Sequence, residues 1–348
     1  MTEKIGFACA YTPLALIDAA GFSPYRILPL GEFLDRAGHV LHDNLCPHVK
    51  KILDRALEND LPPLAGLVFM NSCEAMRRLS DAWAHVRPND RLVLLDLPLT
   101  ASNPSLSFFK GELLRLADLL SDWRGRKITT DDIENSLARL ATLSDLFLKL
   151  RDRQKRSALE GGSAKLQRLY NQSMMEPLDE TLRILKEELS QAELKERSSN
   201  PIPLFIFGNI LPDPEVFSII ESCGATIIDE DLCTGSRMFA PLEMNSSGDI
   251  FERLARAILT RAPCARTFDS ASPLAMADNL VTRARASKVR GIIGHVVKFC
   301  DPYLSRFSTI REVLKNAGIP FLILEGDCTL RSVGQQRTRI EAFIEMLR

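Results

Sequence analysis

Short apolar runs alternate with amphipathic stretches in the first hundred residues and again after residue 200. The apolar runs have the length and continuity of strands buried on both faces of a sheet. Strands are expected at residues 25–29, 65–70, 91–97, 204–207, 225–228, 292–297 and 320–324. Helical spacing predicts helices at residues 14–20, 48–57, 212–222, 249–261, 273–286, 305–317 and 336–347. This alternation is typical of parallel sheets with crossover helices, so the sequence predicts an α/β fold.

The pattern changes between residues 105 and 197, where helical periodicity dominates and strand signals vanish. We expect three or four long helices there, including residues 130–159 and 175–195. Residues 198–201 have the Ser, Asn and Pro content of a linker. The predicted organisation is an N-terminal α/β domain (1–104), a helical segment packed on it (105–198) and a C-terminal α/β domain (199–348). Each sheet is expected to be Rossmann-like or flavodoxin-like.

Two helix starts carry capping signals. Thr12 and Pro13 fit the N-cap and first position of one helix, and Gly21 fits its C-terminal stop. Ser72 is expected to cap a second helix that begins near Cys73.

Composition and charge exclude several classes of protein. Hydrophobic residues make up 45% of the chain and charged residues 26%, as in ordinary globular proteins. Lys and Arg number 44 against 45 Asp and Glu, so no basic footprint for nucleic acid or an anionic membrane is expected. No apolar run reaches the roughly 18–20 residues of a membrane span, and no export signal is expected. We therefore expect a cytoplasmic protein.

Eight cysteines are the chain's most informative chemistry, and no pair has the C-x-x-C spacing. On spacing alone, most of them are expected to be free buried thiols. However, Cys73, Cys233 and Cys300 follow predicted strands, while Cys9 and Cys46 precede predicted helices. Parallel strands end at a shared sheet edge, which is where α/β proteins bind ligands. If the edges of both domains face one cleft, these thiols converge there.

Several motifs resemble the 2-hydroxyacyl-CoA dehydratase and benzoyl-CoA reductase family, D-component type. They are Phe7-x-Cys9-x-Tyr11-x-Pro13, Ser72-Cys73-Glu74, Asp231-Leu232-Cys233-x-Gly235-x-Arg237, Lys298-Phe299-Cys300-Asp301 and Gly334-Gln335-Gln336-Arg337-Thr338-Arg339. The resemblance implies two α/β domains with an iron–sulfur cluster in the cleft between them. It also implies an ATP-hydrolysing iron–sulfur activator that delivers low-potential electrons. The chain lacks a G-x-x-x-x-G-K-[ST] phosphate loop, in agreement with ATP being handled by a partner.

The same resemblance implies a set of ligands. Cys46, Cys73 and Cys300 match the shared cluster ligands, and thiolates suit iron–sulfur clusters. Cys9, Cys233 and Cys264 resemble additional positions of the branch that carries a double-cubane 8Fe–9S cluster. That branch is generally homodimeric and reduces small molecules.

Two other functions stay open. One is a dehydratase or benzoyl-CoA reductase subunit with a 4Fe–4S cluster, acting on an acyl-CoA by ketyl radical chemistry in a heterodimer. The other is a cluster-free partner or maturation protein, which the replacement of family carboxylates by Leu14 and Ala15 favours. Whether Cys264 and Cys328 are ligands is also open.

Three further residues are candidates for catalysis. His295 lies within an apolar strand, so it is either a core histidine or a catalytic one. Lys298 either balances the charge of a cluster or extends to water. Arg237 either pairs a carboxylate, contacts an anionic substrate or forms a salt bridge between the domains.

Overall fold

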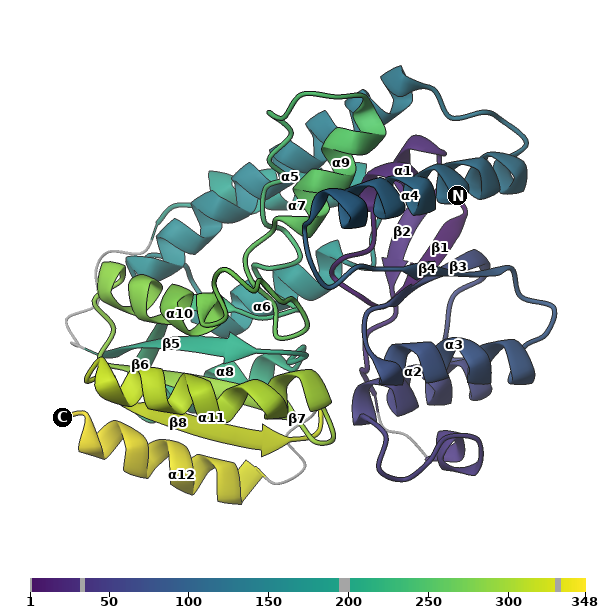
Figure 1. Ribbon diagram of the computed structural model, residues 1–348. Coiled ribbons are helices and arrows are strands. Elements are labelled where there is room, and N and C mark those ends of the chain that lie inside the picture. The colour runs from purple at the N-terminus through teal and green to yellow at the C-terminus, as the bar shows by residue number, and fades with distance from the viewer. Residues whose placement is uncertain (1, 32–34, 194–200, 329–332) are drawn as a thin grey trace.

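The computed structural model describes residues 2–31, 35–193, 201–328 and 333–348, and it contains two four-stranded parallel sheets (Figure 1). The first sheet has the order β2-β1-β3-β4 and consists of β1 (Lys4–Phe7), β2 (Ser23–Arg26), β3 (Leu64–Asn71) and β4 (Leu92–Asp96). The second has the order β6-β5-β7-β8 and consists of β5 (Ile202–Gly208), β6 (Ala225–Asp231), β7 (Gly291–Val297) and β8 (Phe321–Gly326). The predicted α/β class with two parallel sheets is confirmed.

Both sheets share one topology, in which the first and third strands of each half are central. The chain therefore leaves β1 and β3 in opposite directions, as it does β5 and β7. The crevice outside the carboxyl ends of such a strand pair is the usual ligand site of open α/β sheets. Each half thus offers one crevice of this kind.

Twelve α-helices in the described part of the chain cover the sheets. In the first half these are α1 (Leu14–Ala19), α2 (Pro47–Leu57), α3 (Glu74–Val86), α4 (Asn103–Arg124), α5 (Thr130–Lys155), α6 (Gly162–Ser173) and α7 (Leu178–Ser190). In the second half they are α8 (Pro214–Ser222), α9 (Ile250–Leu259), α10 (Ala275–Ala286), α11 (Asp301–Asn316) and α12 (Val333–Met346). A 3₁₀ turn, Arg36–His39, precedes α2. No helix of the described residues combines the length and apolarity needed to cross a membrane.

Each sheet is packed on both faces. Helices α2 and α3 share one core with the first sheet, and α1 and α4 share another. In the second sheet, α8 and α12 lie on one face and α10 and α11 on the other. Long apolar side chains from both sides explain why the strands are continuous hydrophobic runs.

The two halves are interleaved. Helix α9, from the second half of the sequence, packs against α4 and enters the core of the first sheet (Figure 1). Helix α5 contacts β6 in the second half and α1 in the first half. Helix α6 contacts α8. The helical segment therefore packs on both halves, and the boundaries after residues 104 and 198 stay a prediction. Most of the predicted linker 198–201 lies outside the described residues.

Four local predictions need correction. Strand β1 is absent from the predicted set, and β6 continues three residues past residue 228 because arginines neutralise its acidic end. Pro13, not Thr12, is the N-cap of α1, and the Thr12 hydroxyl is buried without a partner. Cys73 rather than Ser72 is the N-cap of α3. Gly21 does follow α1 in the left-handed region, with φ of 82°.

Candidate functional site: a thiol-lined junction of two sheet edges

Cysteines gather where the carboxyl ends of the two sheets meet. Five of them follow strands within a few residues: Cys9 after β1, Cys73 after β3, Cys233 after β6, Cys300 after β7 and Cys328 after β8. Arrowheads of both sheets point toward this junction in Figure 1. The two sheet edges that meet there thus carry thiols from both halves of the chain.

The first set of thiols contains Cys46, Cys73, Cys300 and Cys328. After burial, the neighbouring thiols of Cys328 and Cys300 are what most raise the pKa of Cys46, and Cys73 adds to this. Cys46, Cys73 and Cys300 are the N-cap residues of α2, α3 and α11. Three helix N-termini therefore converge, two from the first half and one from the second. The partial positive charges of those termini favour anionic ligands and thiolates.

Opposing effects act on these thiols. Burial raises the pKa of Cys73 to about 11, while the amide N–H groups of Met76 and Ala75 in α3 oppose that rise. Burial likewise raises the pKa of Cys300, against the Tyr303 amide and the Asn209 side chain. The amides are thus already directed at sulfur, as they would be in a site for bound thiolates.

The second set contains Cys9, Cys233 and Cys264. Burial raises the pKa of Cys233 to about 12, and among its neighbours Arg237 and Arg26 lower it while Cys264 and Cys9 raise it. The two sets adjoin each other, because Cys9 is close enough to Cys73 to raise its pKa and Cys264 is close enough to Cys300 to raise its pKa. The structure therefore brings together all six predicted ligands, three in each set.

The thiols do not close around a single ion. Among the described residues, no three Cys, His, Asp or Glu side chains are grouped closely enough to hold one metal ion. A multi-iron cluster places several irons between its thiolates and needs a wider arrangement. Two adjoining sets of soft ligands fit such a cluster better than a mononuclear site.

Buried arginines provide a second test of this fit. Arg26 is fully buried at the end of β2, where Nη1 donates to the Cys233 carbonyl at 2.5 Å. Its Nε and Nη2 atoms have no partner, and the titratable side chains that neighbour it are the thiols of Cys233 and Cys9. No carboxylate pairs with Arg26 anywhere in the described part of the chain. An unpaired buried guanidinium costs several kcal/mol, so this position fits an anion held by Cys9 and Cys233.

Arg237 has the carboxylate that Arg26 lacks. Its Nη2 lies 2.8 Å from Asp231 Oδ2, and its Nη1 donates to Tyr303 Oη at 2.7 Å. The same Nη1 lies 3.7 Å from the Cys233 sulfur. Of the roles open to Arg237, the structure thus shows the pairing with a carboxylate. Asp231 belongs to the same half of the chain, so this pair does not bridge the two domains, and contact with a substrate stays a prediction.

Asn209 links the two sets, although nothing in the sequence pattern singles it out. Its carbonyl accepts from the Cys233 amide at 2.9 Å, and its Oδ1 accepts from the Val297 amide at 3.1 Å. Its side chain also reaches the Cys300 thiol. One residue after β5 therefore sets the loops that carry Cys233 and Cys300. The only sequence signal is its place directly after an apolar run and a glycine.

Gly208 allows this close approach. A Cβ atom built there would lie 2.0 Å from the carbonyl oxygen of His295, and the φ of Gly208 is 155°. The carbonyl oxygen and the positive φ are both features of the backbone, so rotation of a side chain cannot relieve either of them.

We expect Gly208→Ala to lower the free energy of unfolding by roughly 3 kcal/mol or more, because β5 must move away from β7. Urea unfolding of the purified variant measures this. Gly111→Ala is the control: no atom lies within 4 Å of its added methyl group, and Gly111 is in the interior of α4. That variant should be neutral or stabilising. A Gly208→Ala protein as stable as wild type would show that this approach is not required.

The other two candidates for catalysis are His295, which is buried, and Lys298, which is exposed. His295 is buried on β7, and burial lowers its pKa to about 4, so the imidazole is neutral at pH 7. Lys298 follows β7, and its side chain is exposed. No contact described for Lys298 directs its ammonium group at the thiols. Catalytic roles for both residues stay predictions.

Comparisons with known proteins agree with this arrangement. A family model described as "2-hydroxyglutaryl-CoA dehydratase, D-component" matches residues 9–347. The chain is 24% identical to the (R)-phenyllactyl-CoA dehydratase beta subunit of Clostridium sporogenes, over 99% of this chain and 92% of the relative. It is 24% identical to a benzoyl-CoA reductase subunit of Thauera aromatica, over 92% and 84%. It is 22% identical to the lactoyl-CoA dehydratase subunit beta of Anaerotignum propionicum, over 99% and 91%.

The resemblance seen in the cysteine motifs is therefore confirmed over nearly the whole chain. These three relatives are named as subunits of enzymes that act on acyl-CoA thioesters. The chain belongs to the 2-hydroxyglutaryl-CoA dehydratase D-component family and is an enzyme of that family.

Proposed function

We propose that the chain is an iron–sulfur reductase component that receives low-potential electrons from an ATP-dependent activator and reduces a small molecule. The observation that carries this proposal is that the six predicted ligands lie in two adjoining sets of thiols, three ligands in each set. In the proposal, Cys46, Cys73 and Cys300 hold one cubane, and Cys9, Cys233 and Cys264 hold the other. A double-cubane cluster bound there would supply single electrons at low potential.

The protein's own residues prepare the site for this cluster. Three helix N-termini and the guanidinium groups of Arg26 and Arg237 place positive charge beside the thiols, which stabilises thiolates. Arg237 is fixed by Asp231 and Tyr303, so its charge is pre-positioned. Apolar side chains around Cys46 and Cys328 exclude water.

The alternative is a dehydratase or benzoyl-CoA reductase subunit with one 4Fe–4S cluster and a homologous partner. The relatives favour it, since each of them is named as one subunit of its enzyme. Only the first set of thiols would then bind iron. The second set, with its unpaired arginine, would have no anion to compensate it, which is why we prefer the double cubane.

A cluster-free partner protein is the third possibility. Leu14 and Ala15, which replace family carboxylates, lie at the start of α1, where Ala15 is buried. Their apolar character fits their packing. It gives no account of unpaired Arg26 beside two thiols, so this possibility is the least supported.

Electron transfer is the direct test of the proposal. The iron-loaded protein should lose visible absorption when mixed, without oxygen, with an ATP-hydrolysing activator from the same organism and Mg-ATP. Omission of ATP should prevent the change. Absence of bleaching by both the activator and a strong chemical reductant would reject a redox role. A spectrum that shifts on addition of an acyl-CoA would favour the dehydratase alternative.

Cys328 poses a separate question, because it is a fourth thiol in the first set and is fully buried. Four thiolates would complete an ordinary cubane and leave no iron open. We expect Cys328→Ala to keep the wild-type iron content, because three thiols at helix N-termini suffice for the first cubane. Iron analysis after anaerobic reconstitution measures this. A loss of about half the iron would instead make Cys328 a ligand.

A further inference from the structure

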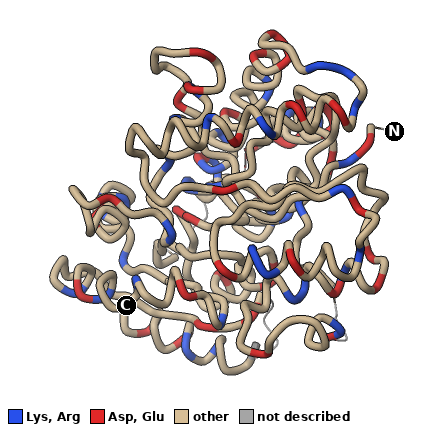
Figure 2. The backbone as a smooth tube through the Cα atoms, turned by 45° about the vertical axis from the view of Figure 1, so that its right-hand side comes forward, with Lys and Arg blue, Asp and Glu red and all other residues tan. Residues whose placement is uncertain are grey.

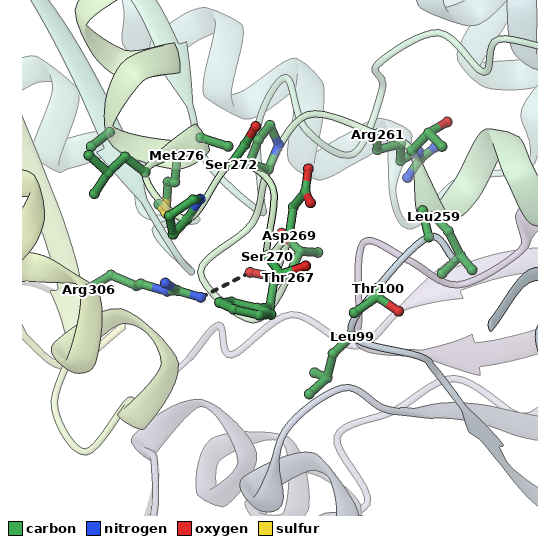
Figure 3. A pocket seen from close by; sticks show the side chains of 18 of the residues that line it. Leu99, Thr100, Leu259, Arg261, Thr267, Asp269, Ser270, Ser272, Met276 and Arg306 are labelled. Carbon is green, nitrogen blue, oxygen red and sulfur yellow. Dashed lines mark hydrogen bonds between the residues drawn. The ribbon is translucent and has the colours of Figure 1, made fainter. Parts of the chain in front are cut away.

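A cavity of about 550 Å³ is lined by Pro263 and Thr267, which flank Cys264 of the second set in the sequence. Figure 3 shows the side chains around this cavity. The loop between β4 and α4, the end of α9, the connection from α9 to α10, the start of α10 and α11 line it. Its volume is in the range of sites for small organic ligands. The connection from α9 to α10 also carries Cys264, so one segment forms both a cavity wall and part of the thiol site.

Hydrogen bonds hold the part of the α9–α10 connection that carries Cys264 and Thr267. The Thr267 hydroxyl accepts from the Cys264 amide at 3.0 Å and donates to the Cys264 carbonyl at 2.8 Å. Arg306 of α11 donates from Nη2 to the Thr267 carbonyl at 3.1 Å, which Figure 3 shows as a dashed line. A ligand in the cavity would therefore be separated from the Cys264 backbone by a single ordered turn.

Arg261 is the distinctive polar group of the cavity. Its Nη1 donates to the Ala10 carbonyl at 2.8 Å, while its Nε is buried and has no partner. No carboxylate of the described residues pairs with it. The titratable side chains that neighbour it are those of Tyr11 and Cys9, and Cys9 belongs to the second set of thiols. The Nη2 atom of Arg261 makes no hydrogen bond within the described residues and is not among the buried atoms, so Arg261 keeps a donor for a ligand in the cavity that it lines.

The rest of the lining is arranged by polarity. Leu99, Phe268 and Leu274 line the cavity although their side chains are between 42% and 56% exposed, so they form an apolar mouth. Phe268 is fixed there because its amide donates to the Leu99 carbonyl at 2.9 Å. Asp269 is the acidic residue of the lining. A positive charge toward the thiols with an apolar mouth matches a carboxylate that carries a hydrocarbon body.

We propose that this cavity binds a small organic acid as its free carboxylate, with Arg261 pairing the carboxylate and the mouth covering the apolar body. This proposal rests on the proposed function and deepens it. An anionic organic substrate would bind next to the second set of thiols. Asp269 opposes the carboxylate and limits its affinity.

Calorimetry of the iron-loaded protein tests the proposal with three matched probes: 3-phenylpropanoate, its neutral amide 3-phenylpropanamide and the cation 3-phenylpropylamine. The carboxylate should bind at least about tenfold more tightly than the amide, and the amine should not bind. Arg261→Gln should abolish the preference for carboxylate over amide, and Arg261→Lys should keep part of it. Arg256→Gln, on α9 but outside the cavity lining, should behave as wild type.

Asp269→Asn provides a test that does not depend on Arg261 variants folding. Removal of its negative charge should tighten carboxylate binding a few-fold and leave amide binding unchanged. Equal affinities for carboxylate and amide in wild type, or a preference that survives in Arg261→Gln, would overturn the proposal. Iron content is measured in the same samples. Iron without carboxylate binding rejects this inference alone, whereas binding without iron rejects the iron–sulfur function alone.

Discussion

Replacement of Cys300 by alanine should remove at least half of the iron that the protein holds after anaerobic reconstitution. Cys300 is the proposed ligand of the first set that follows a strand of the second sheet, at the N-cap of α11. Cys46 and Cys73 come from the first sheet's half of the chain. A cluster held by all three would tie the two halves together, so loss of Cys300 should also lower the midpoint of thermal unfolding toward that of the metal-free protein.

Cys223→Ala is the matched control for this experiment. Cys223 is a partly buried thiol at the C-cap of α8, and its charged neighbours are Glu341 and Arg337 rather than other thiols. It should keep wild-type iron and wild-type thermal stability. Full iron retention in Cys300→Ala would mean that the junction of the two sheets is not the cluster site.

Arg26→Met should have opposite effects in two states of the same protein. In the metal-free protein, the variant should be as stable as wild type or more stable, because a buried unpaired guanidinium is removed. In the iron-loaded protein, it should lower the free energy of unfolding by about 2–4 kcal/mol, because the cluster loses a buried positive charge and donors to sulfur. Thermal and urea unfolding of both states, without oxygen, measure the difference.

Arg55→Met separates this effect from the ordinary loss of a buried arginine. Arg55 has a carboxylate partner, Asp60, at 2.8 Å and donates to the Leu28 carbonyl at 2.9 Å. It should destabilise both states equally. If Arg26→Met also destabilised both states equally, Arg26 would serve only to hold the Cys233 carbonyl.

Periodicity in the sequence was sufficient to predict most elements of the fold. The buried strands at residues 65–70 and 292–297 lack polar interruptions, so their assignment needed no tertiary information. Strand β6 shows where this fails. Its last residues are Asp229, Glu230 and Asp231, and they stay in the strand because Arg151, Arg237 and Arg283 from other elements neutralise them. Such long-range compensation leaves no periodic signal.

Part of the candidate site could likewise be predicted from local sequence, and part of it could not. That Cys73 and Cys300 end buried strands follows from local pattern, but their approach across two sheets depends on how α9 and the long helices interleave the halves. The family resemblance, rather than spacing, selected the six cysteines. Arg26 stands in a family motif, Pro24-x-Arg26, but neither its role nor that of Arg261 could be predicted, because an arginine without a carboxylate partner is recognisable only once burial and neighbours are known.

Figure 2 shows acidic and basic residues interspersed along the backbone, in keeping with the near-zero net charge. The outer surface therefore gives no broad field for steering a partner.

The count of iron and acid-labile sulfide per chain, after complete reconstitution without oxygen, tests the central claim most directly. Three proposed ligands in each of the two sets predict about eight iron atoms per chain, with sulfide in similar amount. About four irons, retained in Cys264→Ala but lost in Cys73→Ala, would support a single cubane on the first set. Fewer than about four irons in the wild-type chain would contradict the assignment of these thiols to an iron–sulfur cluster.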